Sequence, residues 1–155
     1  LEEEFDALRA ANLPFESVPG VTAASAAAAA AGIPLSRRLT ARRIQFVTGH
    51  DVAGALPEDL NISALTDPNA TTVIYMPKRT FASLAELLIQ NGLPKTTPAL
   101  LAESISTPEQ YLQRTTLHSL AQQLSKDISS APGLILYGAL GETPLQDVGV
   151  GCDLS

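Results

Sequence analysis

The sequence predicts an α/β or α+β fold, with one mixed β-sheet of five or six strands flanked by helices. Three observations lead to this prediction. Segments with the apolar spacing of helices alternate with short apolar or uncharged runs that suit strands. Gly and Pro punctuate most of these segments. The 155 residues, 45% of them apolar, suit a single domain with a sizeable core.

The composition also excludes some classes of function. The formal net charge of −6 argues against general binding to nucleic acid or to an anionic membrane. No apolar run approaches the length of about 18 residues that a membrane-spanning helix needs, and no signal peptide is evident. The single cysteine, Cys152, has no partner for an intrachain disulfide, which allows a reducing compartment. We therefore expect a cytoplasmic protein.

The first helix is predicted at the start of the chain. Three glutamates at positions 2–4 suit the positive end of a helix dipole. Phe5, Leu8 and Ala11 then give the helix one apolar face. A short strand is predicted to follow over residues 14–18.

A sharp turn and an alanine-rich helix come next. Pro19 and Gly20 favour the turn, because Pro fixes φ and Gly permits a positive φ. Thr22 is a candidate N-cap for a helix that runs through residues 26–31 and stops at Gly32. This helix carries no charge, so we expect it to be buried on most sides. It is either a packing helix or one that lets a ligand approach its backbone.

A cluster of four arginines follows the alanine-rich helix. Arg37, Arg38, Arg42 and Arg43 are four of the ten basic residues of an acidic chain. Such a cluster forms either a solvated loop with surface ion pairs or a rim that binds carboxylates, which the guanidinium fork matches well. The sequence leaves both interpretations open.

A strand is predicted over residues 44–48, and it ends in Thr48, Gly49 and His50. His50 could act as a general base near neutral pH. We favour a loop histidine that contacts backbone or substrate, because no second chemical group accompanies it. Residues 52–56 are expected to form a mobile, lid-like loop.

A short helix ending near Leu65 is followed by a central strand over residues 71–76, which carries no charge. Pro77 ends this strand. Met76 is either a core residue or a thioether that packs on a cofactor.

The remaining elements alternate in the same way. In order, they are a helix with Phe81 and Leu88 on its apolar side, a strand over 98–102, a strand over 110–117, a helix over 117–128 and a last strand over 132–138. Residues 149–153 are expected to fray.

Four motifs carry a resemblance to a known family. They are V-P-G-V-T-A-A-S at 18–25, A-G-I-P-L at 31–35, T-G-H at 48–50 and Y-M at 75–76. The chain resembles the tetrapyrrole methylases over essentially all of its length, and is most similar to the uroporphyrinogen-III C-methyltransferases, including the methylase module of sirohaem synthases. The resemblance implies the C-terminal subdomain of such an enzyme, with residues 110–117 antiparallel to the strand before them.

The resemblance also implies a missing part. Family members carry an N-terminal subdomain with a Gly-rich cofactor loop and the proposed acid–base residues. This chain has no G-x-G-x-G-D motif and begins at Leu1 without Met. Residues 1–155 are therefore expected to be one domain cut from a longer methylase, and we assign no catalytic residue and no metal ligand to it.

The resemblance further implies a cofactor, S-adenosylmethionine or its product S-adenosylhomocysteine. The residues expected to line it are Thr22, Ala23, Met76, Ile105, Gly138 and Ala139. Those expected to contact the polycarboxylate substrate are Arg37, Arg38 and His50. Pro77 and Ile105 depart from the family pattern, which has a small residue at both positions.

By resemblance, the parent enzyme methylates uroporphyrinogen III to precorrin-2, on the way to sirohaem or cobalamin, and forms a homodimer. Two alternatives stay open. One is a non-catalytic module for folding or dimerisation, and the other is a methylase that acts on a later precorrin.

Overall fold

The computed structural model describes residues 2–141, and in this range it holds five helices and five strands. In chain order they are α1 (Glu2–Ala10), α2 (Ala23–Ala30), β1 (Arg43–Thr48), α3 (Ile62–Leu65), β2 (Ala70–Tyr75), α4 (Phe81–Gln90), β3 (Pro98–Glu103), β4 (Tyr111–Thr116), α5 (Leu117–Leu124) and β5 (Gly133–Gly138). The strands form one sheet in the order β1-β2-β5-β3-β4. β1 is parallel to β2, and all other pairs are antiparallel. The predicted mixed sheet, with β3 antiparallel to β4, is confirmed.

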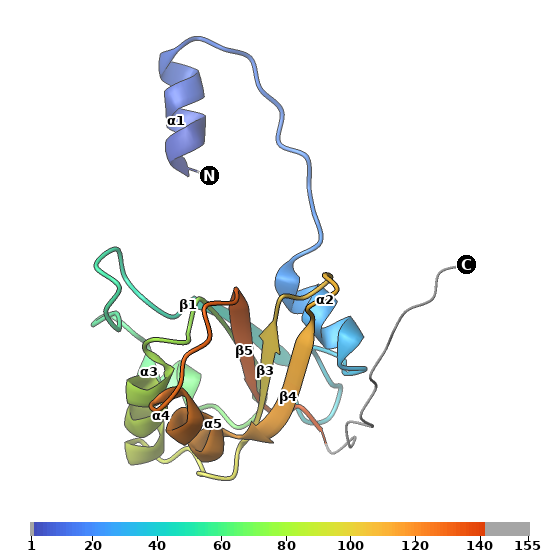
Figure 1. The fold of residues 1–155 in the computed structure, drawn as a ribbon, viewed down its shortest axis with the longest axis vertical. Helices are drawn as coiled ribbons and strands as arrows, with labels where there is room; N and C mark the ends of the chain where they lie inside the picture. Colours follow the sequence, from blue (N-terminus) through green and yellow to red (C-terminus); the bar gives the residue numbers. More distant parts are fainter. Residues whose placement is uncertain (1, 142–155) are drawn as a thin grey trace.

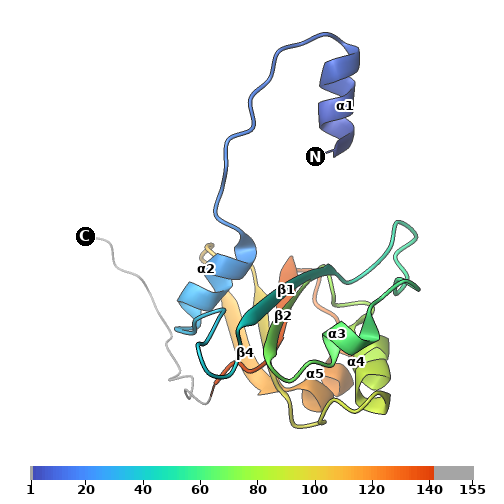
Figure 2. The same cartoon turned by 180° about the vertical axis from the view of Figure 1, so that it is seen from behind.

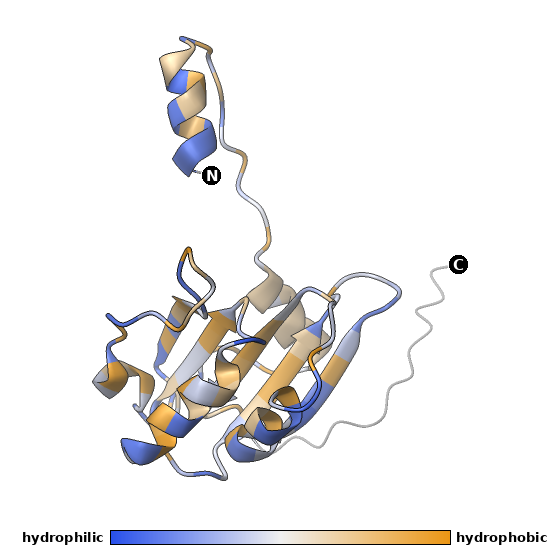
Figure 3. Ribbon diagram, turned by 60° about the vertical axis from the view of Figure 1, so that its left-hand side comes forward, coloured by the Kyte–Doolittle hydropathy of each residue, from blue (hydrophilic) through white to orange (hydrophobic). Residues whose placement is uncertain are grey.

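Helices cover both faces of this sheet, with α3, α4 and α5 on one side and α2 on the other (Figures 1 and 2). Successive residues of a strand point to opposite faces. Ile74 and Leu101 therefore join the cluster beneath α4 and α5, whereas Val73 and Leu100 join the cluster beneath α2. Burial on both faces explains the nearly continuous apolar runs in the inner strands (Figure 3).

The alanine-rich helix α2 begins and ends as predicted. The Thr22 hydroxyl oxygen accepts a hydrogen bond from the Ser25 N–H at 3.2 Å, and Gly32 follows the helix with φ of +64°. Ala24 and Ala27 are fully buried, but the other side of the helix is exposed. The expected burial on most sides is therefore wrong: α2 packs through one face, where small side chains allow close approach to the sheet.

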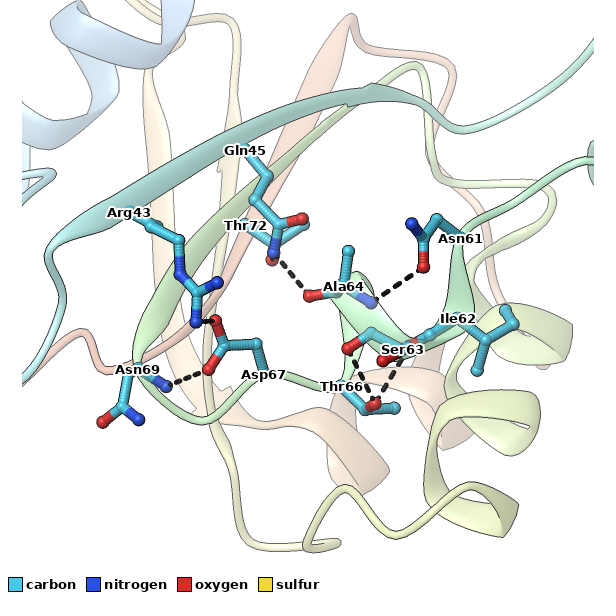
Figure 4. Close-up of polar contacts among 10 residues, drawn as sticks. All are labelled: Arg43, Gln45, Asn61, Ile62, Ser63, Ala64, Thr66, Asp67, Asn69 and Thr72. Carbon is cyan, nitrogen blue, oxygen red and sulfur yellow. Dashed lines mark hydrogen bonds and ion pairs between the residues drawn. The ribbon is translucent and has the colours of Figure 1, made fainter.

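The four-residue helix α3 is held by side chains from its surroundings (Figure 4). Asn61 caps it by accepting from the Ala64 N–H at 3.1 Å, and the Gln45 amide of β1 donates to the Ala64 carbonyl at 2.7 Å. Arg43 forms an ion pair with Asp67. Arg43, one of the four clustered arginines, therefore takes part in a surface ion pair.

The predicted strand over residues 14–18 is absent, and so is the turn at Pro19 and Gly20. Among the described residues no strand pairs with this segment, and an unpaired strand is not stable in water. The Phe15 ring instead stacks on Phe5 of α1, with centroids 4.9 Å apart. No residue of α1 is buried, and the helix stands apart from the sheet (Figures 1 and 2).

Two other predicted elements differ in detail from the structure. The loop after β1 forms a tight turn, in which the Asp51 carboxylate accepts from the Ala53 and Ala55 N–H groups at 2.8 and 2.9 Å; its mobility stays a prediction. Helix α5 ends at Leu124, so Ile128 lies beyond it. Cys152 and the predicted fraying at 149–153 lie outside the described residues.

Within residues 2–141, no helix has the length and apolar character needed to cross a membrane.

Candidate functional site

A hollow of about 1000 Å³ opens at one end of the sheet. β1, β2 and β3 finish at this end, and β5 starts there because it runs antiparallel to β2 and β3. The lining comes from the turns after β1, β2 and β3, from the segment before β5, and from Ala23 at the start of α2. The carboxyl ends of strands are the usual place for ligands in α/β sheets. The hollow is therefore the candidate site.

Met76 stands directly after β2 and lines the hollow with a half-exposed side chain. Its φ is +52°, a left-handed conformation that costs a residue with a Cβ about 1–2 kcal/mol. Pro77 does not disrupt the chain beyond it: the Pro77 carbonyl accepts from the Phe81 N–H at 2.8 Å. The proline thus ends β2 and helps to start α4.

Ile105 lies in the turn after β3 and also lines the hollow. It departs from the family pattern, and a β-branched residue resists a positive φ. In this turn the left-handed conformation falls on the two neighbours of Ile105, Ser104 (φ +48°) and Ser106 (φ +67°). Ile105 is left in an ordinary conformation, half-buried against the cluster beneath α2.

His50 and Ala23 complete the set of predicted residues that meet at the hollow. The Nδ1–H of His50 donates to the Asp51 carbonyl at 2.8 Å, which leaves Nε2 as the acceptor of the neutral ring. Thr22 adjoins Ala23, but its oxygen is already occupied with capping α2.

A buried ion pair supports the floor of the hollow. The Lys78 ammonium donates to the Glu103 carboxylate at 2.6 Å, and the two side chains are only 11% and 12% exposed. It also donates to the Ser129 hydroxyl at 2.8 Å and to the Ala131 carbonyl. All three protons of the ammonium thus have acceptors, and one lysine joins the ends of β2 and β3 to the segment before β5.

The same network sets the charge of Glu103. Burial by itself would raise the pKa of this carboxyl, but hydrogen bonds from Lys78 and Ser129 and the positive charge of Lys78 lower the pKa below its ordinary value. Glu103 is therefore a carboxylate at neutral pH, and its role is to hold Lys78.

Residues 1–121 match the family model of the Tetrapyrrole (Corrin/Porphyrin) Methylases. The chain belongs to this family. The siroheme synthase of Methylococcus capsulatus is 40% identical over 136 residues, which are 88% of this chain and 28% of that protein. The uroporphyrinogen-III C-methyltransferase of Paracoccus denitrificans is 38% identical over 136 residues, 88% of this chain and 47% of that protein.

Among solved structures, the uroporphyrin-III C-methyl transferase of Thermus thermophilus complexed with S-adenyl homocysteine is similar, with a TM-score of 0.71 and 28% identity. The similarity covers 90% of this chain and 59% of that one. This methylase chain therefore spans less than two thirds of each of these relatives.

Four residues predicted for the methylase site lie elsewhere. Gly138 and Ala139 are at the opposite end of β5, where Gly138 pairs with Thr71 at the start of β2. The Arg37 guanidinium donates to the Leu140 carbonyl at 2.7 Å.

The second of the two predicted arginines, Arg38, is exposed. Both precede β1, which runs parallel to β2, so they lie near the end of the sheet away from the hollow.

The roles of Lys78, Glu103 and Ser129 were not predicted from the sequence. The available signal was a charged residue close to the end of each of two apolar strands. This signal could not be used alone, because the contact between the two residues depends on the order of the strands in the sheet.

Proposed function

We propose that the chain supplies one side of the S-adenosylmethionine site of a uroporphyrinogen-III C-methyltransferase, the other side belonging to an N-terminal subdomain. One observation carries the proposal: Ala23, Met76 and Ile105, predicted from three separate parts of the chain, line a single hollow. The similarity to a methyltransferase structure complexed with S-adenyl homocysteine supports the same assignment.

The lining fits such a cofactor. A volume of about 1000 Å³ is at the upper end of the usual range for small-molecule sites, and the Ala23 methyl, the Met76 thioether and the Ile105 side chain offer apolar surface. S-adenosylmethionine, when bound, supplies an activated methyl group on a sulfonium sulfur. The contribution of the chain is to orient the reactants and to exclude water.

The substrate would be a polycarboxylate. Arg37 and Arg38 lie away from the hollow, whereas His50 and the exposed Arg79 line it. We assign the carboxylate contacts at the hollow to Arg79 and His50, since Lys78 is already fully engaged.

Calorimetric titration of the chain with S-adenosylhomocysteine tests the proposal. We expect saturable binding, and we expect Ala23→Leu to weaken it at least about tenfold by filling the hollow. Ala30→Leu, on the exposed far end of the same helix, is the matched control and should bind like the original chain. A folded chain with no saturable binding would contradict the proposal and favour a non-catalytic module.

A further inference from the structure

Two walls of the hollow are in direct backbone contact. The turn after β1 carries Gly49 and His50, and the turn after β2 carries Met76 and Pro77. The Gly49 N–H donates to the Tyr75 carbonyl at 2.7 Å. A Cβ added to Gly49 would lie 2.7 Å from the Cα of Pro77, a distance too short for two carbon atoms. Only glycine allows the two turns to approach this closely.

The side chain of Thr80 contacts both of these turns. Its hydroxyl donates to the Gly49 carbonyl and lies 3.2 Å from the Pro77 carbonyl oxygen. The residue is 6% exposed, so water does not compete effectively for this hydrogen bond.

The hydroxyl of Thr80 is used in an unusual way for its position in the chain. Thr80 is the N-cap residue of α4, a place where a threonine side chain normally accepts from an N–H of its own helix. Here it makes no capping bond, unlike Thr22 and Thr116, which cap α2 and α5. The Thr80 hydroxyl serves the contact between the two turns instead.

We infer that Thr80 is a positioning residue that fixes His50 relative to Met76 across the mouth of the hollow. The hydroxyl acts through the Gly49 carbonyl on one side and the Pro77 backbone on the other, and each neighbour carries a lining residue. Its effect on cofactor affinity rests on the proposed function, but the geometry itself does not.

The test compares Thr80→Val, which removes the hydroxyl and keeps the shape, with Thr80→Ser, which keeps the hydroxyl. Met76 is the single methionine of the chain, so a ¹³C-methyl label gives one signal from the hollow in NMR spectra. We expect the valine variant to shift this signal and the His50 ring signal, and the serine variant to restore both. The His50 signal is identified by its loss in His50→Gln.

Thr97→Val is the matched control. Thr97 is also buried, and its hydroxyl donates to the Pro94 carbonyl at 2.7 Å, before β3 and away from the hollow. Its loss should lower stability without moving the Met76 or His50 signals. Should Thr80→Val fail to fold, Thr80→Ala and Thr80→Ser, which differ only by the hydroxyl oxygen, carry the same comparison.

Cofactor binding gives the second readout. We expect Thr80→Val to weaken S-adenosylhomocysteine binding about tenfold, and Thr80→Ser and Thr97→Val to change it less than about twofold. Unmoved Met76 and His50 signals in the valine variant would overturn the inference. Absence of binding by the original chain would count against the proposed function alone, because the NMR comparison needs no ligand.

Discussion

The two ends of the sheet handle left-handed backbone in different ways. Of the four described residues other than glycine with a positive φ, Met76 and Ser104 line the hollow, and Ser106 lies in the same turn as Ser104. One glycine with a positive φ, Gly54, also lines the hollow. At the opposite end the positive φ values at the strand terminus fall on glycine, at Gly138 and Gly141.

This difference distinguishes positions that are constrained by packing from positions that are constrained by a binding site. Glycine adopts a positive φ at little cost, and the far end uses it where the chain is tightly packed. At the hollow, side chains are retained at positions where they strain the backbone, which is a common property of binding sites. The comparison therefore supports a role for Met76 beyond folding.

The largest expected effect is at the far end. Gly138→Ala should destabilise the fold by about 4 kcal/mol, because the residue has a φ of +112° and its Cβ would overlap the Ala70 carbonyl. Urea unfolding measures the loss. Gly20→Ala, where nothing lies within 4 Å, should change stability little; equal effects at the two positions would remove the packing argument.

Next in size is the ion pair at the hollow. Lys78→Met should cost about 3 kcal/mol, because it leaves the buried Glu103 carboxylate without its charged partner. Combining it with Glu103→Met should recover part of the loss in the same unfolding experiment. Arg9→Met, which breaks the exposed pair with Asp6, serves as the control and should have almost no effect.

The same pair predicts a dependence on pH. The folded pKa of Glu103 lies below the ordinary value of 4.5, so the unfolded chain binds more protons in this range. Its contribution is complete above pH 4.5 and is lost as the pH falls through the lower, folded pKa. Unfolding measured at stepwise lower pH should show a shallower decline in Glu103→Gln than in the original chain; identical slopes would contradict this.

The smallest effect should have the opposite sign. Ser106→Gly is expected to stabilise the fold by about 0.5 kcal/mol, because glycine relieves the positive φ of an exposed turn residue. A small rise in the thermal midpoint would show it. Destabilisation would mean that the backbone of Ser106 is not strained. Ser106 would then no longer count among the strained residues that distinguish the two ends of the sheet.

Local signals predicted most of the elements. The Thr22 cap, the stop at Gly32 and the uncharged run of β2 each depend on neighbours along the chain, and each appears in the structure. The strand over residues 14–18 failed because a strand needs a partner, which sequence pattern does not supply.

The candidate site was only partly predictable for a related reason. Ala23, Met76 and Ile105 follow from the family resemblance, but their meeting depends on the order of strands in the sheet. Gly138 and Lys78 illustrate why. β5 runs antiparallel to β2 and β3, so Gly138 at its end lies away from the hollow. Lys78 follows β2 and meets Glu103 of β3 because these two strands end on the same side of the sheet.

The middle place of β5 in the sheet has a consequence for biosynthesis. β5 is the last strand to leave the ribosome among the five described, yet it separates β2 from β3. Until it arrives, the nascent chain holds two separate strand pairs, each with an open hydrogen-bonding edge that could join another molecule. The central gap therefore stays open from the emergence of β4, which ends at Thr116, until β5, which begins at Gly133, has left the ribosome.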